Sequence, residues 1–164
     1  MARVNCGNVL CQPSLRPWPG ISMMTGRKPW AASALASASA FVASRGLPIE
    51  RLVLLAPAAS PPEYTRLFAQ VFGLSERTRA AMQRRIEARE GILMPQFEPA
   101  VVGSQIRVPT LVAHDRHDSI NRFADGQAYA DAVTGARLMC TEGLGHRKIL
   151  QDRRVIEQVV AFST

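Results

Sequence analysis

Apolar and polar positions along the chain form short blocks that predict alternating helices and strands. Two continuous apolar runs, residues 51–57 (RLVLLAP) and 108–113 (VPTLVA), have the length of a strand, and a shorter run covers residues 136–140. Apolar runs without alternation are typical of strands that are covered on both faces, as in a parallel sheet between helices. The sequence therefore predicts a parallel sheet.

Helix-like blocks separate these runs. Residues 31–44 are rich in Ala and Ser and end before Gly46, and helical spacing recurs at 75–90, 123–133 and 155–162. The sequence Ser60-Pro61-Pro62-Glu63 predicts a capping box that starts another helix, whose apolar face is formed by Leu67, Phe68, Val71 and Phe72. We expect an α/β fold, a parallel sheet flanked by helices, with a helical lid insert at about residues 60–105.

The first thirty residues differ from the rest of the chain. Four prolines interrupt them, and neither a helical nor an alternating period persists. We therefore expect an irregular segment at 1–30 and a domain at 31–164. Because this segment lacks the apolar core of a signal peptide and no run has the length of a membrane span, the sequence predicts a cytoplasmic location and no membrane partner.

The net charge of +7 raises the possibility of nucleic-acid binding. The basic residues are mostly Arg and are spread along the chain, and two Tyr and two Trp are too few for a stacking platform. No nucleic-acid partner is therefore expected, although binding of an anionic partner through Arg stays an alternative.

Cysteine and histidine positions do not favour a metal centre. Three cysteines, Cys6, Cys11 and Cys140, match no zinc spacing, and Cys140 lies in an apolar run that predicts a buried thiol. The adjacent ligand-type residues at 114–118 cannot all converge on one ion. We expect no metal and no cofactor.

Catalytic-type side chains follow two of the predicted strands. The first strand ends in the polar cluster His114-Asp115-Arg116-His117-Asp118, and the second ends in a glycine-containing loop that carries His146. The carboxyl ends of parallel strands meet at one edge of a sheet, where ligands and chemistry collect. An acid and an imidazole are thus expected side by side.

These segments resemble the C-terminal half of the α/β-hydrolase fold. The similarity rests on PTLVAHDRHD, ARLMCTEGLGH and, more weakly, GLPIERLVLLAP. In this family the catalytic acid usually stands three residues after a Gly or an equivalent small polar residue that follows the strand. Asp118 stands three residues after Asp115, so the resemblance implies that Asp118 is the catalytic acid and that His146 is the catalytic base. It implies hydrolysis of an ester or related acyl bond of a small molecule by a serine nucleophile, since a Ser hydroxyl needs a His to take its proton.

The resemblance places the nucleophile at Ser33. The family's elbow reads Gly-x-Ser-x-Gly, whereas Ser33 lies in Ala31-Ala32-Ser33-Ala34-Leu35, with Leu where the second Gly belongs. Ser22 follows a leading Gly but lies further upstream, and Ser37 and Ser39 are typical of helix packing.

A second hypothesis is an inactive fragment. Only about thirty residues precede Ser33, and they do not predict the strands and the oxyanion loop that the family has there. The alternative is therefore a truncated hydrolase without activity, whose exposed sheet edge allows self-association.

Overall fold

A four-stranded parallel sheet in the order β1-β2-β3-β4 forms the centre of the fold. The structure is a computed structural model that describes residues 30–31, 36–58 and 60–164. The strands are β1 (Trp30–Ala31), β2 (Leu52–Leu55), β3 (Thr110–Asp115) and β4 (Arg137–Thr141). The helices around them are α1 (Ala36–Ser44), α5 (Phe123–Ala132), α6 (Gly145–Lys148) and α7 (Arg153–Ser163). The predicted fold class, a parallel sheet flanked by helices, is confirmed.

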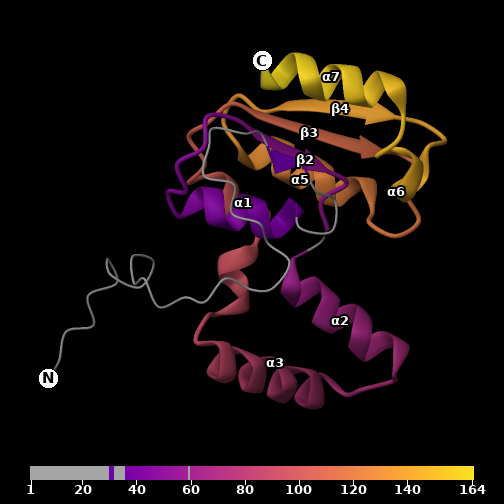
Figure 1. The fold of residues 1–164 in the computed structure, drawn as a ribbon. Helices are drawn as coiled ribbons and strands as arrows, with labels where there is room; N and C mark the ends of the chain where they lie inside the picture. The colour runs from indigo at the N-terminus through magenta and orange to yellow at the C-terminus, as the bar shows by residue number, and fades with distance from the viewer. Residues whose placement is uncertain (1–29, 32–35, 59) are drawn as a thin grey trace, which may run out of the picture.

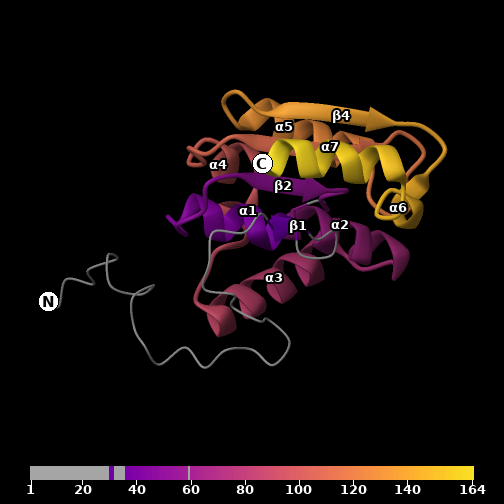
Figure 2. The same ribbon diagram turned by 45° about the horizontal axis from the view of Figure 1, so that its top comes forward.

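Each face of the sheet has its own apolar core. Leu52, Leu54 and Val112 face one side, where they pack with α1 and α5. Val53 and Leu55 face the other side, where they pack with α7. Figures 1 and 2 show α7 on one side of the sheet and α1 and α5 on the other. Because β2 is buried on both faces, its residues are all apolar, without alternation.

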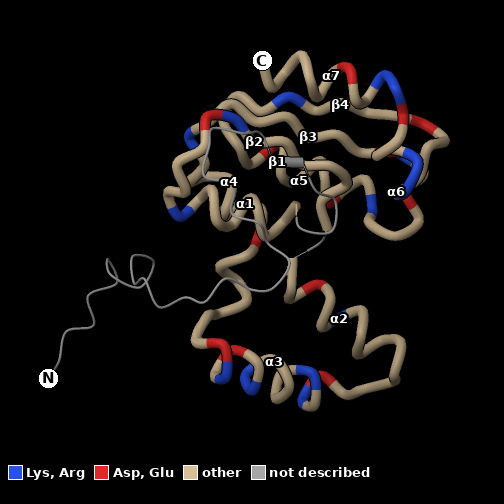
Figure 3. Tube along the Cα trace, in the orientation of Figure 1, with Lys and Arg blue, Asp and Glu red and all other residues tan. Residues whose placement is uncertain are grey.

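A helical insert joins β2 to β3 and projects from the sheet (Figure 1). It comprises α2 (Pro61–Val71), α3 (Glu76–Glu90), the 3-10 helix η1 (Met94–Phe97) and α4 (Pro99–Gly103). The helix α3 ends at Gly91, whose φ of 70° is the left-handed conformation that glycine adopts easily. Figure 3 shows charges of both signs along α3, which has no buried residue and carries five Arg and three Glu.

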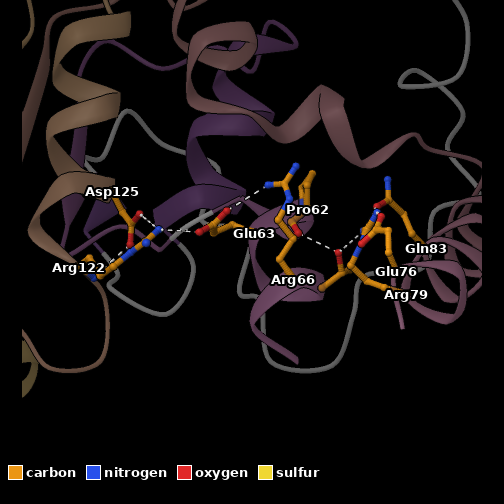
Figure 4. A network of polar contacts seen from close by, with 9 residues as sticks. Pro62, Glu63, Arg66, Glu76, Arg79, Gln83, Arg122 and Asp125 are labelled. Atoms are coloured by element: carbon orange, nitrogen blue, oxygen red, sulfur yellow. Dashed lines mark hydrogen bonds and ion pairs between the residues drawn. The ribbon is translucent and has the colours of Figure 1, made fainter. Parts of the chain in front are cut away.

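Polar contacts fix the insert to the loop after β3. In Figure 4, Arg122 lies between Asp125 and Glu63 of α2, at 3.2 Å from each carboxylate. Glu63 also pairs with Arg66 at 3.1 Å, and Arg79 of α3 donates to Thr65 of α2 at 2.9 Å. The base of α2 is therefore held at the carboxyl edge of the sheet.

Three local predictions were wrong. The first helix does not start at Ala31, because Trp30 and Ala31 pair with β2 as the edge strand β1. The capping box at Ser60 does not form, since the Ser60 side chain caps no N–H group and Glu63 pairs with Arg66 and Arg122 instead. Cys140 is exposed, since within the described residues β4 pairs with β3 alone.

The apolar face of α2 is also open to solvent. Leu67, Phe68, Val71 and Phe72 are exposed by 53%, 45%, 70% and 63%. The buried residues of the helix are instead Pro62, Thr65 and Ala69. Within the described residues, this apolar face is thus an uncovered surface beside the carboxyl edge of the sheet.

Candidate active site

The acid and the histidine lie on loops that leave neighbouring strands. Strands β3 and β4 pair in parallel up to Asp115 and Thr141, so both chains leave the sheet at the same edge. The first loop delivers Asp118 and the second delivers His146, in the first turn of α6. The sequence predicted this meeting of two strand ends.

A short hydrogen bond joins the two side chains. Nδ1 of His146 lies 2.8 Å from Oδ2 of Asp118, and because a carboxylate oxygen accepts, Nδ1 donates. The Asp118 side chain is fully buried, whereas 17% of the His146 side chain is exposed. In the neutral imidazole this bond places the single ring proton on Nδ1, so that Nε2 can accept a proton.

Backbone groups hold the second oxygen of Asp118. The N–H groups of Ile120 and Asn121 donate to Oδ1 at 2.8 and 2.9 Å. Both oxygens of the carboxylate therefore have partners, which fixes its orientation toward His146.

His114 is a buried neighbour of this pair whose contacts the sequence did not reveal. Its ring is fully buried, with Nε2 3.1 Å from the carbonyl oxygen of Asn121 and 3.5 Å from Oδ2 of Asp118. Both neighbours are acceptors, so Nε2 carries the proton. Among the described residues, Nδ1 has no hydrogen-bond partner. A Cβ at Gly126 would lie 2.3 Å from Nδ1, so the glycine makes room for the ring.

Asp115 connects the acid loop with the histidine loop. Thr141 Oγ1 donates to its carboxylate at 2.7 Å, the Leu144 N–H at 3.0 Å and the His117 N–H at 2.9 Å. Burial raises the pKa of Asp115, but these bonds and one from the Gly145 N–H outweigh that effect and lower the pKa to about 2. From the sequence, Asp115 was only one member of the polar cluster that ends the strand.

Asn121 connects the acid loop with β2 and the insert. Its amide Nδ2 donates to the carbonyl oxygen of Ala56 at 2.8 Å, and the Tyr64 hydroxyl donates to its Oδ1 at 3.2 Å. Ala56, just after β2, has a φ of 45°, a strained conformation for a residue with a side chain. Burial, followed by the charge of Asp125, raises the pKa of Tyr64.

Solved structures share this arrangement of strands and helices. A hydrolase from Pseudomonas aeruginosa matches with a TM-score of 0.55 and 20% identity over 82% of this chain and 63% of that chain. An α/β fold family hydrolase from Bacillus anthracis matches with a TM-score of 0.56 and 12% identity over 82% and 66%. The enol-lactonase from Burkholderia xenovorans gives 0.52 and 20% over 83% and 65%. The chain has part of an α/β-hydrolase fold.

The match to α/β-hydrolase structures is partial. The chain spans 63–66% of the length of these three hydrolases. No protein-family model matches the sequence, and no curated protein matches it either. The likeness thus establishes the fold alone.

The predicted nucleophile lies outside the described residues, as does Ser22. Ser33 belongs to the link of residues 32–35, between the end of β1 at Ala31 and the start of α1 at Ala36. Ser37, in the first turn of α1, donates to the carbonyl oxygen of Ala58 at 3.0 Å, which agrees with a packing role.

Neither a metal-binding cluster nor a membrane-spanning helix occurs among the described residues. No group of three or more His, Cys, Asp or Glu side chains within ranges 30–31, 36–58 and 60–164 is placed to hold a metal ion. Over the same part of the chain, no helix combines the length and the apolar character that crossing a membrane requires.

Proposed function

We propose that this chain carries a serine-hydrolase centre that cleaves an ester or related acyl bond of a small molecule. Ser33 is the nucleophile, His146 the general base and then acid, and Asp118 the carboxylate that orients the imidazole. The observation that supports this most is the 2.8 Å contact between His146 and a fully buried Asp118 at the carboxyl edge of the sheet.

The geometry suits the proton transfers of acyl transfer. His146 Nε2 takes the proton of Ser33 as its Oγ bonds to the acyl carbon, and then gives that proton to the departing alcohol. The same nitrogen then deprotonates a water molecule, which attacks the acyl carbon of the acyl-enzyme. The bond between the acyl carbon and Ser33 Oγ breaks, the acid leaves, and His146 returns the proton to Ser33. Throughout, Asp118 holds the Nδ1 proton and stabilises the imidazolium.

The place of Ser33 in the sequence, between a described strand and a described helix, supports the proposed role. A serine nucleophile of this fold follows a strand and precedes a helix. Residues 32–35 connect a strand with a helix, and β1 pairs in parallel with β2. The end of β1 therefore points to the same edge as the ends of β3 and β4.

The insert supports an apolar acyl substrate. Tyr64 at the base of α2 contacts Asn121 of the acid loop, and the exposed apolar side chains of the helix follow from there. Two solved structures of the same fold are named an enol-lactonase and an N-acyl homoserine lactone degrading enzyme. Both names refer to lactones, which are cyclic esters.

Turnover of p-nitrophenyl esters and labelling by a fluorophosphonate probe test the proposal. We expect hydrolysis that falls at least about 1000-fold in Ser33→Ala and in His146→Ala. Ser39→Ala, on the neighbouring helix α1, is the matched control and should retain activity. Labelling that survives in Ser33→Ala but disappears in Ser22→Ala would move the nucleophile to Ser22.

The second candidate is an inactive hydrolase fold that associates through its sheet edge. The observation that favours it is the length of β1, which has two residues and, among the residues that the structure describes, lies at the edge of the sheet. If this second candidate is correct, the chain is folded but the fluorophosphonate probe does not label it. Size-exclusion chromatography with light scattering should then show a dimer or a larger species. A labelled monomer would exclude it. The cytoplasmic location and the absence of a nucleic-acid partner stay predictions of the sequence.

A further inference from the structure

Asp115 is a second buried acid beside the proposed catalytic pair. It is the last residue of β3, its exposed fraction is 0%, and no step of the proposed chemistry uses it. A buried carboxylate needs several hydrogen-bond donors to be tolerated. The donors that surround Asp115 therefore show which parts of the site it holds in place.

On one side Asp115 holds the segment that carries His146. Its Oδ2 accepts from Thr141 Oγ1 at 2.7 Å and from the Leu144 N–H at 3.0 Å, and the carboxylate also accepts from the Gly145 N–H. These donors lie immediately before His146 in the chain. Leu144 occupies the N-cap position of α6 and has no capping side chain, so the carboxylate of Asp115 acts in place of a cap.

On the other side Asp115 shapes the loop that carries Asp118. Its Oδ1 accepts from the His117 N–H at 2.9 Å, and its own carbonyl oxygen accepts from the Asp118 N–H at 3.2 Å. An Asp that bonds to the backbone two residues later forms a tight turn. One side chain thus bonds to both loops on which the acid and the histidine lie.

We propose that Asp115 is a positioning residue that sets His146 against Asp118 by bonding to both of their loops. This inference rests on the proposed hydrolase function for its catalytic consequence, but the geometry it describes exists without turnover. If Asp115 served stability alone, its loss would lower the melting temperature and leave the contact between His146 and Asp118 intact.

The test compares the full chain with four variants. Asp115→Ala removes the carboxylate, and Thr141→Val removes a single donor, which is a milder change if the first variant unfolds. Asp152→Ala is the matched control, because its side chain caps α7 by accepting from the Val155 N–H at 3.1 Å and only its backbone, which the substitution retains, bonds to Lys148 of α6. Thr141→Ser retains the hydroxyl and should behave as the wild type.

The main measurement is the tautomer of His146, read from the ring nitrogens by long-range ¹H–¹⁵N NMR. We expect the proton on Nδ1 in the wild type and in Asp152→Ala, and a shift of the proton toward Nε2 in Asp115→Ala and Thr141→Val. Retention of the wild-type tautomer in folded Asp115→Ala and Thr141→Val would overturn the proposal.

Ester turnover adds a second measurement. We expect kcat to fall about 10- to 100-fold in Asp115→Ala with KM nearly unchanged, because a displacement of about 1 Å costs that much in rate. A kcat equal to that of Asp152→Ala would contradict a positioning role. If the wild type hydrolyses no ester and the tautomer still shifts, the proposed function fails and the positioning by Asp115 stands.

Discussion

Replacement of Asp118 by Asn tests the proposed triad most directly. In the wild type, Oδ1 accepts from two backbone N–H groups and Oδ2 accepts from His146 Nδ1. In the variant, both backbone bonds are kept only if the asparagine oxygen occupies the place of Oδ1. The NH₂ group then occupies the place of Oδ2 and faces His146. The reverse orientation leaves two N–H groups facing a donor, at a cost of about 2 kcal/mol or more. The first orientation is therefore favoured about 30-fold.

This orientation forces the wrong tautomer on His146. With an NH₂ group opposite, Nδ1 must accept, so the ring proton moves to Nε2 and that nitrogen can no longer take the proton of Ser33. The variant also loses the carboxylate that stabilises the imidazolium. We expect kcat to fall about 10³- to 10⁴-fold, which corresponds to about 4–5.5 kcal/mol in the barrier.

The assay is steady-state hydrolysis of a p-nitrophenyl ester, with the tautomer measured by NMR on the same samples. Asp131→Asn, an exposed acid on α5 that accepts from Gln127, is the matched control and should keep full activity. An Asp118→Asn variant that is folded and retains activity within about threefold of the wild type would refute the reasoning, because the triad cannot work with its acid neutralised.

Three further outcomes are expected. The pKa of Asp115, lowered to about 2, stabilises the fold above the ordinary value of 3.8, and this contribution is lost as the pH falls from about 4 to about 2. Acid unfolding followed by circular dichroism should therefore lose this step in Asp115→Asn, and an unchanged profile would contradict the pKa shift. Gly126→Ala places a Cβ 2.3 Å from His114 and should cost about 1–3 kcal/mol in urea unfolding. Combination with His114→Ala should recover part of that cost, and strict additivity would show that the two residues do not clash. Val71→Lys and Phe72→Lys, at exposed apolar positions, should change the unfolding free energy by less than about 0.5 kcal/mol but reduce binding of an apolar dye, whereas a large destabilisation would mean that the face is covered.

Much of the fold follows from sequence patterns that act locally. The apolar runs that became β2 and β3 are buried on both faces, and such a run has few alternatives to a central parallel strand. The strand β1 is different, because it has two residues and its pairing with β2 depends on the rest of the sheet. A segment of two residues has no periodicity, so the sequence pattern did not predict this strand.

The same distinction separates Asp118 from Asp115. Asp118 was predicted because its distance from the end of an apolar run fits a known pattern. The importance of Asp115 could not be predicted, since most of its donors come from residues 141–145, which approach it only through the pairing of β3 with β4. Likewise, nothing local in Gly126 indicates that a buried ring lies against it.

The contact between acid and histidine is built almost wholly from the C-terminal part of the chain. The partners of Asp118 and Asp115 lie within residues 114–146, and Asn121 adds a single bond back to Ala56 after β2. A partial hydrolase fold can therefore hold two members of a triad in place whether or not its first strands are complete. It follows that the tautomer of His146 and the reactivity of Ser33 are independent questions. A chain with the proton on Nδ1 and no labelled serine would keep the contact between His146 and Asp118 without the proposed hydrolase activity.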